Sequence, residues 1–277
     1  MTRRRPFQAQ GLQSLGLVFI LLRRVAEEEP VAMHKSTSLV LRCQDWSETS
    51  QVVLLLARDV GRVRCLAKGS RRPKNPFGGP LDRWILGEAV FSLRDPNQLA
   101  VLVELYETER FEGVRRRLEA FYGASLVTEL VVALVPEADP QPEVFDLAVR
   151  ALALLSDVPA DACRAIAYAF AWRLLALLGY SPEMARCVEC GTLLKAGAPA
   201  DFSPASGGLV CSRCRKPGDA CRWSARAVEA VRFLAGADWN EIPRVRLSEA
   251  TRREVRTALE RRVAELAGKE PLAARYV

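Results

Sequence analysis

Histidine is almost absent from this chain of 277 residues, in which His34 is the single example. We interpret it as a solvated residue rather than a metal ligand or base, and no HExxH motif exists. The order around Lys68 is Lys-Gly-Ser instead of the Gly-Lys-Ser of a Walker loop, so ATP hydrolysis is not expected. Acidic residues form no cluster at a spacing typical of magnesium sites. These absences argue against an enzyme, and a zinc-containing nuclease or glycosylase remains the alternative.

A hydrophobic run long enough to cross a bilayer is also missing near the N-terminus, where the apolar residues 15–22 are too few. An arginine triplet precedes this run, as in a signal peptide, but more charged residues follow it and no small-x-small cleavage site is present. We therefore interpret residues 1–32 as a disordered extension or a mis-assigned start, with Met33 as the natural first residue. No membrane association is expected.

Cysteine is present in an informative pattern. Cys187 and Cys190 form one CxxC pair, and Cys211 and Cys214 form a second pair after twenty intervening residues. Four thiolates at this spacing can complete a tetrahedral shell around one zinc ion, with a hairpin-like excursion between the pairs. Because four protein ligands leave no position for water or substrate, the predicted Zn²⁺ is structural.

The remaining cysteines stand singly and are interpreted as small buried hydrophobes. Cys221 is near enough to the second pair to act as a spare ligand. Zinc thiolates together with unpaired cysteines indicate a reducing compartment, which predicts a cytoplasmic protein. The four single cysteines are Cys43, Cys65, Cys163 and Cys221.

The formal net charge of +7 is unevenly distributed. Residues 33–80 contain nine Lys and Arg against three Asp and Glu, whereas residues 81–277 contain twenty-six against twenty-seven. Nearly all of the excess positive charge is therefore assigned to one short segment, which predicts an electrostatic site for a polyanion.

That basic segment lies in a region with the alternation of β-strands, expected at residues 38–43, 51–58, 62–68, 84–94 and 99–107. Turns are predicted at residues 59–61, with Gly61 at positive φ, and at residues 95–97. Five short strands in about seventy residues are typical of an OB-fold barrel. The Pro- and Gly-rich residues 69–80 predict a mobile loop on its rim.

Basic side chains recur along the third expected strand and this loop. Arg62 and Arg64 alternate with apolar residues, so both should point out of the barrel. Such a track matches the phosphates of a nucleic-acid strand, and Phe77, Trp46 or Trp84 could stack on a base, although Trp84 fits the core better. The predicted track consists of Arg62, Arg64, Lys68, Arg71, Arg72 and Lys74.

Helical periodicity replaces the β pattern from residue 111 onward, with helices expected at residues 114–135, 142–156, 161–178, 224–236 and 248–267. Asp161, Ser224 and Ser248 are the candidate N-caps. The predicted fold class is α+β, with an OB-fold β-barrel at residues 33–108. An α-helical domain at residues 109–277 follows, and the four-cysteine zinc finger at residues 187–214 is inserted in it.

Several short motifs, in the same order along nearly the whole chain from Met33, resemble those of the bacterial recombination mediator family RecO. No single motif is specific, but the series is. The motifs are Trp46-Ser47-Glu48-Thr49-Ser50, Gly61-Arg62-Val63-Arg64, Ala67-Lys68-Gly69, Leu178-Gly179-Tyr180-Ser181-Pro182 and Cys187-Val188-Glu189-Cys190-Gly191.

This resemblance implies a protein that binds single- and double-stranded DNA, anneals complementary strands and helps load RecA on gaps. It also implies pairing with RecR and contact with the acidic C-terminal tail of single-stranded DNA-binding protein (SSB). By position it adds Lys35 and Arg42 to the DNA-binding candidates. The SSB tail would need an apolar pocket with basic groups in the helical domain, where Arg164 and Arg173 are candidates. A zinc-ribbon transcription factor is disfavoured because no basic recognition helix lies near the cysteines.

Overall fold

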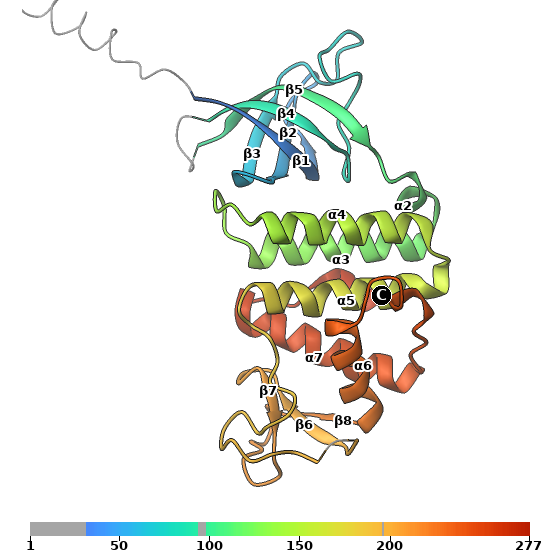
Figure 1. Cartoon of the computed structure of the whole chain (residues 1–277). Helices are drawn as coiled ribbons and strands as arrows, with labels where there is room; N and C mark the ends of the chain where they lie inside the picture. The colour runs from blue at the N-terminus through green and yellow to red at the C-terminus, as the bar shows by residue number, and fades with distance from the viewer. Residues whose placement is uncertain (1–31, 94–97, 196) are drawn as a thin grey trace, which may run out of the picture.

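The computed structural model describes residues 32–93, 98–195 and 197–277. Most of the predicted extension and the turn predicted at residues 95–97 lie outside the described residues. Figure 1 shows a β-barrel at one end of the molecule, stacked helices in the middle and a small β-sheet at the other end. Within the described ranges, every helix falls short of the length and apolarity needed to span a membrane.

Five strands close the barrel in the order β1-β2-β3-β5-β4, with β4 pairing back onto β1. Neighbouring strands are antiparallel except β3 and β5, which pair in parallel from Cys65 opposite Ala100 to Ala67 opposite Leu102. This is the OB-fold arrangement that the strand pattern predicted. The strands are β1 (Ala32–Asp45), β2 (Gln51–Ala57), β3 (Gly61–Ala67), β4 (Leu86–Leu93) and β5 (Ala100–Glu109).

The first strand is longer than predicted, because its N-terminal half pairs with β4 and its C-terminal half with β2. The N-terminal half was not predicted because polar residues such as Lys35 and Ser36 interrupt the apolar–polar alternation there. A register shift between Val40 and Arg42 marks a bulge, which lets one strand bend to serve both neighbours. In β3 the alternation holds as predicted, since Val63 is buried.

The helices follow the barrel in chain order. Ser224 and Ser248 cap α6 and α7 as predicted, because their hydroxyls accept hydrogen bonds from the backbone N–H of Ala227 and Thr251. Asp161 is not a cap, since α5 begins one residue earlier with Pro159 in the N-cap position. The helices are α2 (Glu112–Arg116), α3 (Leu118–Leu134), α4 (Pro142–Asp157), α5 (Ala160–Leu177), α6 (Ala225–Gly236) and α7 (Glu249–Ala267).

The single helix predicted at residues 114–135 is two helices, because Arg117 adopts an extended conformation between α2 and α3. Its guanidinium donates hydrogen bonds to the backbone carbonyls of Leu155, Ser156 and Val158 at the end of α4. These carbonyls at the end of α4 lack a partner inside their own helix, and Arg117 supplies one. To reach them, Arg117 itself leaves the helical conformation, which separates α2 from α3.

The central helix is α5, which contacts α3, α4 and α6. Its residues from Ala162 to Leu175 are almost all buried, in keeping with a helix that is apolar around its whole circumference. This core continues to the outer wall of the barrel, where Leu39, Leu56 and Trp84 join it. A separate apolar cluster fills the barrel interior.

Polar contacts fix the barrel on the helices as well. The Trp84 indole N–H donates to the Thr128 hydroxyl of α3 at 2.9 Å, and Trp84 adopts a positive φ of 60° just before β4. The strand predicted from residue 84 therefore begins only at Leu86. Barrel and helices consequently share one continuous packing surface.

Candidate metal centre and nucleic-acid interface

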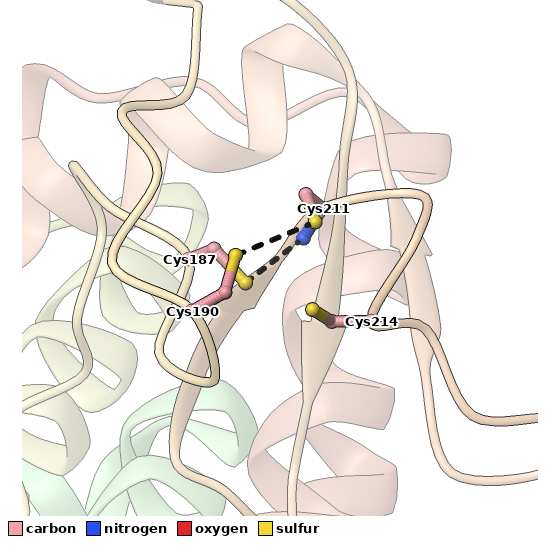
Figure 2. A group of neighbouring side chains, drawn as sticks. All are labelled: Cys187, Cys190, Cys211 and Cys214. Carbon is pink, nitrogen blue, oxygen red and sulfur yellow. Dashed lines mark hydrogen bonds between the residues drawn. The ribbon is translucent and has the colours of Figure 1, made fainter.

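The four cysteines of the two CxxC pairs come together in one place, as Figure 2 shows. Their sulfur atoms all lie within 4.8 Å of one another, and those of Cys190 and Cys211 are 3.8 Å apart. Zn–S bonds of about 2.3 Å in a tetrahedron require sulfur atoms about 3.8 Å apart. Cys187, Cys190, Cys211 and Cys214 can therefore hold one metal ion without rearranging the backbone.

The first pair lies on a tight turn. The Gly191 N–H donates to the Cys187 carbonyl at 2.8 Å, and Gly191 has a positive φ of 71°, which a residue with a side chain rarely adopts. Cys190 Sγ forms a hydrogen bond with the Thr192 hydroxyl at 3.3 Å, and this contact, together with hydrogen bonds to the Thr192 backbone and to the Cys187 and Cys214 side chains, lowers the pKa of Cys190 to about 6. A thiol that ionises readily suits a metal ligand, because the thiolate is the binding form.

The second pair follows a short hairpin of β6 (Ala200–Ser203) and β7 (Gly208–Val210). The Cys211 backbone N–H donates to Cys187 Sγ at 3.3 Å, which links the two pairs (Figure 2). Gly207 turns the hairpin with a positive φ of 73°. The hairpin-like excursion between the pairs is thus confirmed.

A third strand that the sequence did not reveal, β8 (Cys221–Trp223), pairs with β6. It brings Trp223 over Phe202 with ring centroids 4.5 Å apart and planes 4° from parallel. Trp172 of α5 meets both rings edge-on. This aromatic cluster joins the cysteine-rich sheet to the helical core.

The four single cysteines differ in how deeply they are buried. Cys65 and Cys163 are buried as predicted, whereas Cys43 and Cys221 are half-buried. Cys221 is not part of the four-sulfur group, so its suggested role as a spare ligand is wrong. Its sulfur lies 3.5 Å from a guanidinium nitrogen of Arg261 instead.

His34 and the predicted basic track also have definite positions. The imidazole of His34 stacks on Phe91 with centroids 5.6 Å apart, so it is not a freely solvated residue. Arg62 donates to the Val132 carbonyl at 3.0 Å, at the C-terminal end of α3, and burial lowers the pKa of its guanidinium. Arg62 therefore holds the barrel on the helices, and we omit it from the DNA-binding set.

Arg64 lies beside it on the outer wall of the barrel and is exposed, with Nε 3.6 Å from Glu137 Oε2. Arg42 and Arg64 face the same residue of β2, Leu54, from its two neighbouring strands, and Arg42 is exposed. Lys35 is exposed as well, but on the half of β1 that pairs with β4.

The loop after β3 exposes Lys68, Arg71, Arg72 and Lys74. The start of this loop is hydrogen-bonded to the barrel. Ser70 is fully buried and donates to Gln51 Oε1 at 3.0 Å, and the Arg71 N–H donates to the Thr49 carbonyl at 3.1 Å. Arg71 also forms an ion pair with Asp45.

Of the three aromatic residues considered for stacking, Trp84 is 2% exposed, Phe77 is partly buried against the barrel core and Trp46 is 67% exposed. Trp46 follows Asp45, the ion-pair partner of Arg71, in the β1–β2 turn. The residue that carries this exposed indole is therefore next in the chain to a partner of the basic loop.

The two arginines suggested for an acidic peptide differ. Arg173 donates to the carbonyls of Leu234 and Ala237 at the end of α6, and its guanidinium lies 4.1 Å from the Trp239 ring centroid. It has a structural role, and burial lowers its pKa. Arg164 lines a cavity of about 170 Å³ together with Arg246.

A larger pocket, of about 550 Å³, lies between α6 and α7. Sequence periodicity could not reveal it, because the segment between the two helices supplies part of the wall. Its lining combines apolar side chains, among them Phe233, Val245 and Leu247, with two basic ones and one acidic one, Arg226, Arg246 and Glu229.

Comparison with known proteins agrees with this architecture. Residues 32–108 match the family model described as Recombination protein O N terminal, and residues 115–275 match Recombination protein O C terminal. The chain belongs to the RecO family. These proteins act in DNA repair and recombination, as the resemblance had implied.

Similar proteins, each described as DNA repair protein RecO, come from diverse bacteria. The protein of Rhodopirellula baltica is 37% identical over 203 residues, which cover 72% of this chain and 73% of the relative. That of Symbiobacterium thermophilum is 30% identical over 231 residues, covering 83% and 90%. That of Salinibacter ruber is 35% identical over 222 residues, covering 80% and 83%.

Proposed function

We propose that this protein is a non-enzymatic recombination mediator that binds single- and double-stranded DNA and anneals complementary strands. The observation that carries the proposal is the exposed basic loop of the OB barrel with Trp46 beside it. The DNA-binding set is Arg64, Lys68, Arg71, Arg72 and Lys74, extended by Arg42 and, at the far half of β1, by Lys35.

Annealing needs no bond chemistry. Arginine and lysine side chains neutralise phosphates on two strands and release counterions, so the strands approach while base pairing supplies the driving force. Phosphate contacts carry no base information, so binding without sequence preference is expected. Affinity should fall steeply as salt concentration rises.

The metal in this proposal is one Zn²⁺ with a structural role. Four sulfur donors suit zinc, and they occupy every position of a tetrahedral shell, which leaves none for a reacting water molecule. The residues that would hold it are Cys187, Cys190, Cys211 and Cys214.

For the acidic C-terminal tail of SSB we propose the pocket between α6 and α7. Phe233, Val245 and Leu247 offer apolar surface, while Arg226 and Arg246 supply positive charge for carboxylates and outnumber the single acidic lining residue, Glu229. Arg246 forms an ion pair with the exposed residue Asp161, with Nη2 2.8 Å from Oδ2. A carboxylate of the peptide would replace Asp161 as its partner. We further propose that the protein binds RecR directly, assists the loading of RecA indirectly and acts in the cytoplasm.

The decisive experiment is annealing of complementary oligonucleotides coated with cognate SSB, without nucleotide. The parent should accelerate annealing above the spontaneous rate, and Arg71→Ala combined with Arg72→Ala should reduce both the acceleration and the salt dependence of DNA binding. The matched control is Arg116→Ala with Lys269→Ala, two exposed basic residues outside the barrel loop.

No acceleration by the parent, with DNA binding intact, would reject the mediator role. Cleavage or base loss in labelled DNA incubated with magnesium would favour the nuclease or glycosylase alternative instead. An unchanged salt slope in the loop variant would move the DNA site away from residues 68–74.

A further inference from the structure

Positive charge is concentrated in a second part of the chain, which the overall balance of residues 81–277 conceals. Residues 81–212 contain eleven Lys and Arg against eighteen Asp and Glu, whereas residues 213–277 contain fifteen against nine. The two imbalances cancel in the sum. The basic part runs from the end of the second cysteine pair through β8, α6 and α7.

Within this part, a groove of about 360 Å³ lies between β8 and α7. Arg253, Thr257 and Arg261 follow one another at four-residue spacing and therefore lie on one face of α7. Arg222 of β8 lines the groove from the opposite side. Three guanidinium groups from two elements thus surround one surface depression.

These guanidinium groups are accessible. The side chains of Arg222 and Arg253 are 63% and 68% exposed, and Arg261 is exposed as well. Arg222 is oriented by Asp201, whose carboxylate accepts its Nη1 at 2.9 Å and is itself almost buried. Among the described residues, Arg253 pairs with Glu249, whose Oε1 lies 3.9 Å away.

One carboxylate, that of Glu254, lines the groove too, but it has other partners. Its Oε2 accepts hydrogen bonds from the backbone N–H and the hydroxyl of Ser224, both at 2.8 Å. It therefore helps to fix the start of α6 against α7. Among the lining residues, three guanidinium groups therefore stand against one carboxylate, while the acidic partners of Arg222 and Arg253, Asp201 and Glu249, lie outside the lining.

We infer that this groove binds the phosphate backbone of a second nucleic-acid segment, separate from the segment on the barrel. The rest of its lining consists of small residues such as Ala220 and Ala250, which offer little apolar area. A peptide with apolar anchors finds a better site in the α6–α7 pocket, whereas guanidinium groups around a polar groove match phosphate oxygens in pairs.

The position of the groove gives it a distinct role. Figure 1 shows the barrel at one end of the molecule and β8, with the adjoining α7, toward the other. One molecule would therefore hold two strands, or two segments of one strand, at the same time. Tethering raises the effective concentration of the second strand near the first, which accelerates encounter without any new contact between them. The inference rests on the proposed DNA-binding function.

The test uses the full chain and two non-complementary oligonucleotides that carry different fluorophores. Co-capture of both by one immobilised protein molecule is expected for the parent. Arg253→Glu combined with Arg261→Glu should retain binding of one oligonucleotide and lose the second.

Arg116→Glu with Lys269→Glu provides the same charge reversal outside the groove and should retain both oligonucleotides. Thr257→Glu adds a carboxylate to the groove while keeping every arginine, and it should also weaken the second binding event. This variant keeps the inference testable if the double variant fails to fold. Metal content and thermal midpoint report folding for each variant.

Equal co-capture by the parent and both groove variants would overturn the inference, and so would a parent that captures one oligonucleotide only. A barrel-loop variant, Arg71→Ala with Arg72→Ala, separates this result from failure of the proposed function, because it should weaken the first binding event and leave the groove intact. Binding of an acidic peptide but not DNA to the groove would assign it to a protein partner instead.

Discussion

Arg58 and Asp146 form a two-point ion pair across the junction between the barrel and the helices. Arg58 Nε lies 3.1 Å from Asp146 Oδ1, and Nη2 lies 2.9 Å from Oδ2. Arg58 follows β2, and Asp146 lies on α4, so the contact ties two parts of the chain that are 88 residues apart. The planar geometry of both groups favours this paired arrangement.

This ion pair predicts a pH-dependent contribution to stability. The hydrogen bond from Arg58 holds the pKa of Asp146 below its usual range. A carboxyl with a lowered folded-state pKa stabilises the fold above its unfolded pKa of about 3.9 and loses that contribution as pH falls through the folded value. Asp146→Asn should therefore lower the urea midpoint at pH 7, and the difference from the parent should shrink toward pH 2.

Glu48→Gln removes an exposed carboxylate in the β1–β2 turn and serves as the control, with little change at either pH. Both partners of the Arg58–Asp146 pair are partly exposed, at 42% and 56%, so solvent screening keeps the effect small. A midpoint difference that stays constant from pH 7 to pH 2 would contradict the electrostatic explanation.

The four-sulfur group predicts a bound metal and its loss on substitution. The parent should contain one zinc ion per chain, and Cys187→Ser or Cys211→Ser should release it and lower the thermal midpoint, because metal binding is coupled to folding of such sites. Cys221→Ser should keep the metal, since this residue is outside the group. Metal analysis after gel filtration and thermal unfolding provide the measurements.

Zinc content equal to the parent in the Cys187→Ser and Cys211→Ser proteins would refute the metal assignment. DNA binding by the barrel should change little in these variants, because the barrel lies at the far end of the molecule from the cysteines (Figure 1). A parallel loss of barrel binding would mean that the metal supports the whole chain rather than one end of it.

The aromatic cluster beneath the metal predicts a large loss of stability for Trp223→Ala. Trp223 is fully buried and contacts Phe202 and Trp172, and removal of such a ring typically costs about 3–5 kcal/mol. Trp223→Phe should cost much less, because it keeps a ring and removes an indole N–H that has no hydrogen-bond partner in the structure. Denaturant unfolding would distinguish the two, and equal losses would contradict this view.

Features with a local sequence signature were predictable. The CxxC pairs fix their own geometry through short turns, and strand β3 shows its alternation between Val63 and Arg64 directly in the sequence. Ser224 and Ser248 are visible as caps because a cap depends only on the next few residues. Gly61 likewise adopts the positive φ that its hairpin requires, 87°.

Features that depend on distant partners were not predictable. The sequence predicts Arg62 as one member of a basic strand, but its hydrogen-bond partner is the carbonyl of Val132 on a helix seventy residues later. Arg117 interrupts a helical pattern because α4 ends against it. The groove between β8 and α7 needs two elements of opposite type, and a summed charge concealed its arginines.

The exposed ring of Trp46 predicts a contribution to single-strand binding that is independent of salt. Stacking of one base on an aromatic side chain is worth about 1–3 kcal/mol, so Trp46→Ala should weaken binding by about 5- to 150-fold. Because stacking releases no counterions, the salt slope should stay at the parent value, in contrast to the loop arginine variants. Trp46→Phe should recover most of the affinity.

The control is Tyr106→Ala, which removes a ring of β5 that is 76% exposed and should leave binding unchanged. Parent affinity in Trp46→Ala would exclude this ring as a stacking platform, whereas a lowered slope would show that the substitution disturbs the neighbouring Asp45–Arg71 ion pair.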